Sequence, residues 1–230
     1  MKKALSAIIL SVMIISSPAS AKEESTCYGT TEKGKLENGW QLPKSGKNFI
    51  AYSLLGDLSG RNYVHSKVYA VVVDAYTILE KAAPSKTFVY GETGWAKGGP
   101  FRPHKTHQNG LSVDFFVPVR NSKGESVPLP ASAFNKFGYS IEFDSNGKYG
   151  DYSIDFEAMV AHLVAIKQAA DKQGVKIWRV IFDNDLQKLL FKTARGAELQ
   201  AAFNFSKKKP WIRHDEHYHI DFMVPCKGLN

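Results

Sequence analysis

The sequence predicts an α+β protein with a central, mainly antiparallel sheet that is flanked by helices. Segments with apolar residues at helical spacing alternate with short runs of β-branched and aromatic residues, and no internal repeat interrupts them. The last of these runs alternates polar and apolar residues, as a half-buried strand does. The 230 residues are enough for one domain that buries a substantial core.

The first 21 residues have the composition of a secretory signal peptide. Lys2 and Lys3 precede an apolar run over residues 4–15, and residues 19–21 form a small-residue cleavage site. The apolar run is shorter than the ~20 residues that cross a bilayer. We therefore expect cleavage after Ala21 and an exported protein without integral membrane association, rather than a chain held by an uncleaved anchor.

The beginning of the mature chain differs in composition from the rest. Residues 22–48 are polar and rich in Gly, Lys and Thr, which predicts a loosely folded lead-in to a compact domain over residues 49–230. In that domain, apolar residues at helical spacing predict a helix over residues 67–82 that ends before Pro84. Its β-branched residues leave a strand as the alternative.

The middle of the chain predicts a strand, a loop and a second strand. Residues 87–90 have strand character, and the glycine-rich residues 91–100 form a loop of the kind that often borders an active site. The run over residues 111–119 alternates, which places Asp114 on one face and Val113 on the other. Asp114 is then a carboxylate aimed from a strand.

The second half of the chain predicts helix, strand, helix and strand. Asp155 is the expected N-cap of a helix over residues 156–173, which is followed by a strand over residues 175–182 and a short helix over residues 186–194. The final strand, over residues 217–224, places two histidines and an aspartate on one face. These three residues are His217, His219 and Asp221.

Five of the seven histidines fall into two groups, and the other two, His65 and His162, are expected to be structural. A pair of ligands completed by a distant segment is how a fold builds a three-ligand metal site with one open position. With only two cysteines in the chain, imidazole and carboxylate ligands favour a single hydrolytic zinc ion. The two groups are His104 and His107 ahead of Asp114, and His214, His217 and His219.

Strand geometry separates ligands from other roles. His107 on the loop, Asp114 on the strand that the loop enters, and His219 on the last strand form the predicted ligand set. His217 is two residues, ~6 to 7 Å, from His219 along the same strand face, so we predict a general base or an oxyanion stabiliser.

Two further histidines, His104 and His214, have open roles. Each could be a ligand, a proton shuttle or a partner that orients a ligand.

Export and an even number of cysteines predict a disulfide between Cys27 and Cys226, with two buried free thiols as the alternative. The formal net charge of +8 could suit nucleic acid, but the chain has no recognised nucleic-acid-binding motif. An exported basic protein meets the polyanionic cell envelope, so the charge favours an acidic envelope substrate over nucleic acid.

Three sequence elements together resemble the penicillin-insensitive murein endopeptidases. These elements are GGPF, HKTHQNGLSVD and HDEHYH. The resemblance runs from about Tyr52 to Cys226. The family is part of a wider group of zinc peptidases, which includes D-alanyl-D-alanine metallocarboxypeptidases and lysostaphin-like enzymes. The resemblance implies zinc ligands at His107, Asp114 and His219, a catalytic His217, and further active-site histidines at His104 and His214.

The implied activity is periplasmic cleavage of the peptide cross-links of peptidoglycan, between D-alanine and meso-diaminopimelate and sometimes between two diaminopimelates. Its partners are then peptidoglycan peptide stems. Penicillin should not inhibit such an enzyme, because no serine is acylated. A second zinc ion is not expected, since residues 146–149 lack the Asp and His that some family members carry there.

Several functions remain open from the sequence alone. A metallocarboxypeptidase of the same group, a non-catalytic wall- or metal-binding protein and a metal-dependent phosphodiesterase could each use His and Asp ligands. The sequence defines neither the preferred cross-link nor the oligomeric state.

Overall fold

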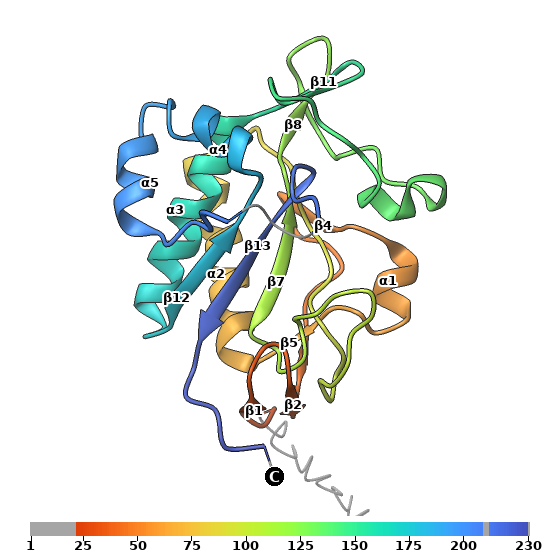
Figure 1. Ribbon diagram of the computed structural model, residues 1–230, viewed down its shortest axis with the longest axis vertical. Coiled ribbons are helices and arrows are strands. Elements are labelled where there is room, and N and C mark those ends of the chain that lie inside the picture. Colours follow the sequence, from red (N-terminus) through yellow and green to blue (C-terminus); the bar gives the residue numbers. More distant parts are fainter. Residues whose placement is uncertain (1–21, 209–211, 230) are drawn as a thin grey trace, which may run out of the picture.

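A five-stranded sheet lies at the centre of the computed structural model, which describes residues 22–208 and 212–229 (Figure 1). The predicted signal peptide, residues 1–21, lies outside the described residues. All neighbouring strands are antiparallel except the parallel pair at one edge, β4 and β6, so the predicted α+β fold is confirmed. In spatial order the strands are β12 (Lys176–Ile181), β13 (His217–Met223), β7 (Ser112–Phe116), β6 (Phe88–Tyr90) and β4 (Phe49–Ala51).

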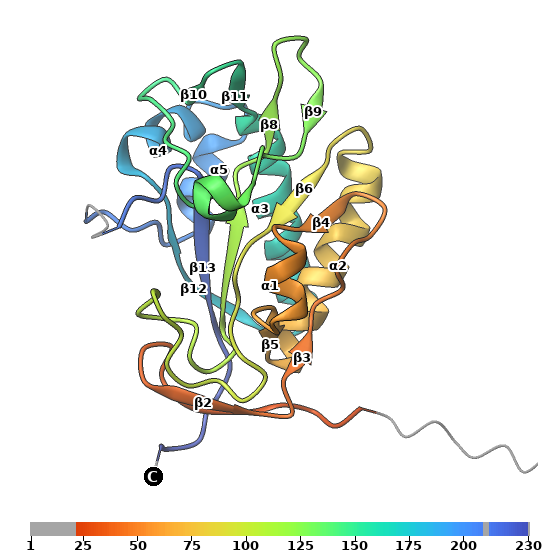
Figure 2. The ribbon, with the colours of Figure 1, turned by 90° about the vertical axis from the view of Figure 1, so that its right-hand side faces the viewer.

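Two long helices cover one face of this sheet (Figures 1 and 2). They are α2 (Ser66–Ala82) and α3 (Phe156–Lys172), and both were predicted. Six buried apolar residues along α2 make one apolar side, which decides against the alternative of a strand. The α3 helix begins where the Asp155 side chain accepts a hydrogen bond from the Ala158 N–H (3.2 Å), as expected of an N-cap. His65 caps α2 in the same manner through Nδ1.

The short helices are less well predicted. The helix expected over residues 186–194 is replaced by two, α4 (Asn184–Leu190) and α5 (Gly196–Ala202). With Asp183 as its cap, α4 begins two residues ahead of the expected start and ends at Leu190, and α5 begins at Gly196. A further short helix, α1 (Leu54–Leu58), was not predicted.

Residues 22–48 form strands and contribute to the core, which differs from the loosely folded lead-in expected from their composition. Leu36 and Leu42 are buried in the main core, although the segment is polar in composition. The Cys27–Cys226 disulfide is present, as predicted, and ties this segment to the end of β13. The segment contributes β1 (Thr26–Gly29), β2 (Gly34–Glu37) and β3 (Trp40–Gln41), which pairs with β5 (Tyr63–Val64).

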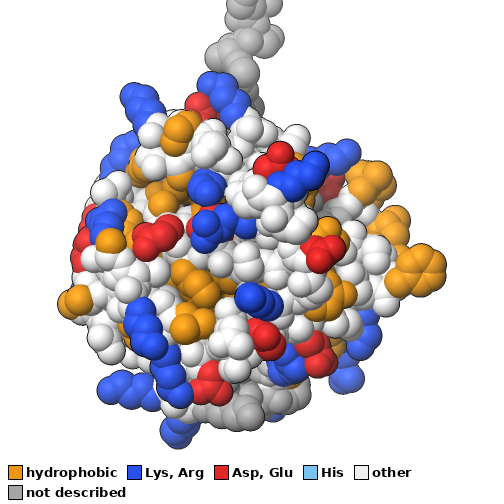
Figure 3. All heavy atoms as spheres, turned by 90° about the horizontal axis from the view of Figure 1, so that it is seen from above, with side chains coloured by type: hydrophobic (Ala, Val, Ile, Leu, Met, Phe, Trp, Pro, Cys, Tyr) orange, Lys and Arg blue, Asp and Glu red, His pale blue; other side chains and the backbone are white. Residues whose placement is uncertain are grey.

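A small sheet caps one end of the molecule, beside the short 3-10 helix η1 (Ala133–Gly138). The predicted strand over residues 111–119 is divided between β7 and this sheet. Seen from that end, basic and acidic side chains are interspersed over the surface (Figure 3). The small sheet consists of β8 (Val119–Arg120), β9 (Ser126–Val127), β10 (Lys148–Tyr149) and β11 (Tyr152–Ile154). None of the helices in residues 22–208 and 212–229 has the length and apolar character to cross a bilayer.

Candidate metal centre

The pairing of β7 with β13 brings the two histidine groups together. In their antiparallel register, His219 lies directly opposite Asp114, although the two are 105 residues apart in the chain. The Nδ1 atom of His219 lies 2.8 Å from Oδ1 of Asp114. The glycine-rich loop delivers His107, whose Nε2 lies 3.3 Å from the same oxygen. Two imidazole nitrogens therefore converge on one buried carboxylate oxygen.

His107 presents an unprotonated nitrogen to Asp114. Its Nδ1 donates to the backbone carbonyl of Thr93 at 3.1 Å, so in the neutral ring the lone pair is on Nε2. The side chain is fully buried, and its Nε2 has no hydrogen-bond partner. Burial lowers the pKa of His107 despite the nearby carboxylate of Asp114. A lone pair that faces a carboxylate in the interior needs a positive charge between them, which a metal ion supplies.

His219 is held for ligation by a chain of polar contacts. Its Nε2 lies 2.8 Å from Oδ1 of Asp221, and Asp221 accepts hydrogen bonds from Ser112 Oγ and Arg179 Nε, each at 2.6 Å. Metal-binding histidines commonly donate their second ring nitrogen to a carboxylate in this way. The arrangement turns Nδ1 of His219 towards Asp114.

The charges of this centre favour a bound cation. Burial alone would raise the pKa of Asp114, but the surrounding histidines, His107 foremost, hold it well below its usual range. Burial opposes protonation of His219, yet the Asp221 charge and the hydrogen bonds of both carboxylates raise its pKa to about 10. The pocket therefore stabilises positive charge beside Asp114, and the donor set of imidazole and carboxylate suits zinc.

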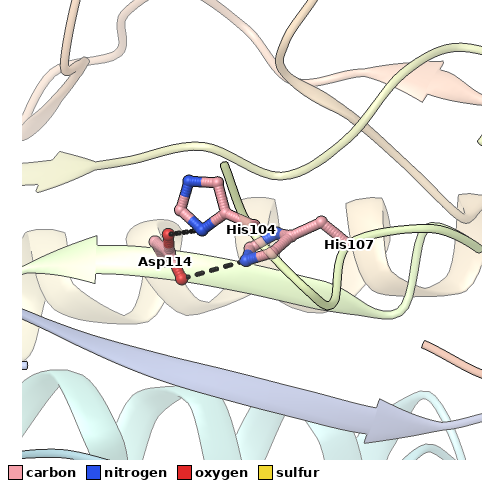
Figure 4. A group of neighbouring side chains, drawn as sticks. All are labelled: His104, His107 and Asp114. Atoms are coloured by element: carbon pink, nitrogen blue, oxygen red, sulfur yellow. Dashed lines mark ion pairs between the residues drawn. The ribbon is translucent and has the colours of Figure 1, made fainter. Parts of the chain in front are cut away.

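The second oxygen of Asp114 faces a different group of side chains. Tyr139 donates to Oδ2 at 3.0 Å, while His104 Nδ1 and His217 Nε2 lie 3.8 and 3.9 Å from it. Figure 4 shows the rings of His104 and His107 above β7, each joined to Asp114 by an ion pair. One ligand atom each from His104, His107 and Asp114 lie within 4.8 Å of one another. His104 is thus a possible ligand as well.

His217 and His214 complete the cluster, with ring centroids 4.5 Å apart. The Nδ1 atom of His217 lies 2.8 Å from Oε1 of Glu216, and burial lowers the pKa of His217 to about 4 and raises that of Glu216 to about 9. His214 donates from Nδ1 to the Ile212 carbonyl at 2.8 Å. Burial lowers the pKa of His214 to about 3. All six predicted site residues therefore meet in one place.

Several residues of the site were not predicted from the sequence. Glu92, two residues after the end of β6, contacts His104, and Tyr139, which follows η1, contacts Asp114. Tyr139 also accepts the backbone N–H of Glu92 at 2.8 Å. Both residues lie in irregular segments without periodicity. The only sequence signal was their glycine-rich surroundings.

The chain is similar to a known protein family. The profile of a family described as penicillin-insensitive murein endopeptidase matches residues 27–229, which include every residue of the cluster. No curated protein matches the chain.

Proposed function

The chain belongs to the penicillin-insensitive murein endopeptidases, and from this we propose that it is a zinc-dependent peptidase that cleaves peptide cross-links of peptidoglycan. The observation that carries the zinc proposal is the buried, unpartnered Nε2 of His107, which faces Asp114. Zinc would be held by His107 Nε2, Asp114 and His219 Nδ1. His107 and His219 share Oδ1 of Asp114, whereas His104 faces the other oxygen at the longer distance of 3.8 Å.

The catalytic roles follow from the two sides of Asp114. Bound zinc lowers the pKa of a water molecule to about 7 and polarises a carbonyl group. His217, on the Oδ2 side, would accept the proton of the water that attacks the peptide carbonyl and pass it to the leaving amine. Tyr139 and Glu216 hold Asp114 and the His217 ring in place through the hydrogen bonds described above.

The substrate proposal names the bond between D-alanine and meso-diaminopimelate, and also the bond between two diaminopimelates. Penicillin would not act on this site, because its reacting groups are imidazoles and a carboxylate rather than an acylated serine. The disulfide supports a periplasmic location, since disulfides persist in oxidising compartments. The predicted signal peptide is consistent with the same location.

Digestion of purified sacculi by the mature protein tests this proposal. We expect cross-linked dimers to be converted to monomers, as identified by the masses of the released fragments. Penicillin should leave the rate unchanged, and a chelator should abolish it until zinc is restored. Release of free D-alanine alone would indicate a carboxypeptidase instead, and intact dimers after incubation with zinc-loaded protein would contradict the proposed activity.

A further inference from the structure

His104 is, like His214, a site histidine that is partly exposed to solvent, and its ring is held by a carboxylate. Its side chain is 17% exposed, against 3% for His217. The Nε2 atom lies 2.5 Å from Oε2 of Glu92, while Nδ1 faces Oδ2 of Asp114 at 3.8 Å. His104 therefore lies between Glu92 and the side of the metal centre that His107 and His219 leave open.

Glu92 is itself fixed by donors on its other oxygen. Oε1 accepts a hydrogen bond from the hydroxyl of Tyr52 at 2.9 Å and one from Nε of Arg61. The Arg61 guanidinium lies over the rings of Trp95 and Phe101, 4.8 and 4.1 Å from their centroids, which restrains it further. Arginine can only donate. Oε1 is thus committed to Arg61, and Oε2 is left for His104.

The proton on His104 follows from this arrangement. Glu92 forms an ion pair with the guanidinium of Arg61, so the group is a carboxylate that only accepts. The short contact with Glu92 therefore requires a proton on Nε2 of His104. In the neutral ring, the lone pair is then on Nδ1, which faces the metal centre.

We propose that Glu92 is a positioning residue that holds His104 in the Nε2–H tautomer and thereby turns an acceptor nitrogen towards the open side of the metal centre. The tautomer follows from the contact between Glu92 and His104 and does not depend on the proposed function. Its catalytic consequence does rest on the proposed function: His104 would be a second proton acceptor beside His217. Asp221 does for His219 what Glu92 does for His104: each carboxylate is anchored by an arginine and binds Nε2.

The variant Glu92→Gln tests the proposal because it is nearly isosteric. Arg61 still requires an acceptor at the Oε1 position, so the amide oxygen stays there and the NH₂ group occupies the Oε2 position. That NH₂ donates to Nε2 of His104 and forces the proton to Nδ1. We expect nitrogen NMR of the zinc-loaded, histidine-labelled mature chain to show Nε2 protonated in wild type and Nδ1 protonated in the variant.

Activity and zinc content give a second measurement. With the proton on Nδ1 of His104, the rate of hydrolysis should fall by roughly 10²-fold or more, the effect of losing a proton acceptor. Bound zinc should stay at wild-type stoichiometry. The double variant Glu92→Gln with Arg61→Met also removes the donor that fixes the amide oxygen at the Oε1 position. The amide is then free to rotate, because the Tyr52 hydroxyl can accept a hydrogen bond from its NH₂ group. This double variant should regain the Nε2–H tautomer.

The matched control is Asp155→Asn, which neutralises another buried carboxylate that pairs with Lys86 at 2.7 Å away from the site. It should leave the His104 tautomer unchanged. A wild-type His104 with an unprotonated Nε2 or a zinc-bound Nδ1 would overturn the proposal, even if Glu92→Gln does not fold. An unchanged tautomer in folded Glu92→Gln would overturn it too. Absence of murein hydrolysis alongside the expected tautomers would contradict only the proposed function.

Discussion

Two buried histidines on opposite faces of the central sheet show what makes a metal site here. His107 and His162 are almost wholly buried, at 0% and 1% exposure, and each has an Nε2 without a hydrogen-bond partner. On the helix-covered face, Nδ1 of His162 lies 2.8 Å from the Tyr218 hydroxyl, and the ring packs against that of Phe115. Burial alone lowers its pKa to about 3.

The other face differs in one chemical respect. The free nitrogen of His107 is aimed at the carboxylate of Asp114, whereas the ring of His162 lies among aromatic side chains such as Phe88 and Phe115. Burial and an unpartnered nitrogen therefore do not define a cation site by themselves. A converging carboxylate supplies the negative charge that retains a cation in a place with little water.

The comparison predicts that zinc binding depends on residues of the polar face and not on those of the apolar face. We expect His219→Ala to lose nearly all zinc, because one of three ligands and its orienting contact with Asp221 disappear. His162→Asn, which keeps an acceptor for Tyr218, should retain it. Metal analysis after gel filtration measures both. Near-stoichiometric zinc in His219→Ala would remove His219 from the ligand set, and loss of zinc in His104→Ala would place His104 in it.

A second change separates binding from chemistry within the polar face. His217→Ala should keep zinc and fold but lower murein hydrolysis by ~10² to 10⁴-fold, the usual contribution of a general acid or base. Zinc content and the rate of dimer cleavage are measured on the same preparation. Activity within a few-fold of wild type would shift the proton transfer to another residue, with His214 the first to be tested.

The Cys27–Cys226 disulfide belongs to neither face and should contribute to stability rather than to catalysis. Cys27 and Cys226 are 199 residues apart in the chain, so their bond should stabilise the fold by about 2 to 5 kcal/mol, mainly by restricting the unfolded state. Reduction should lower the melting temperature more than it lowers activity at moderate temperature. Two free thiols in denatured, unreduced protein from an oxidising compartment would show that the bond does not form.

The apolar face contributes a dependence of stability on pH. The lowered pKa of His162, about 3, means that the unfolded chain binds a proton below pH ~6.5 while the folded one does not. Stability should therefore fall by up to about 1.4 kcal/mol per pH unit as the pH drops from 6.5 towards 3. In His162→Asn, the free energy of unfolding, measured by denaturant titration at several pH values, should change less steeply with pH. An equal dependence on pH in the variant and the wild type would contradict this account.

Local patterns determined much of this protein. Helical spacing located α2 and α3, because an amphipathic helix records its buried side in one continuous stretch of residues. Alternation along residues 217–224 placed His217, His219 and Asp221 on one face before any partner strand was known. Residue chemistry, with few thiols and many imidazoles, indicated the type of metal centre.

The tertiary structure alone decided which atoms meet. The register that sets His219 opposite Asp114 joins segments about a hundred residues apart, and sequence periodicity carries no information on such a pairing. Glu92 and Tyr139 come from irregular segments, so no pattern predicted that they would hold His104 and Asp114. Buried Leu36 likewise became part of the core only through long-range packing. Periodicity fixes which way a side chain points, while long-range contacts fix what it points at.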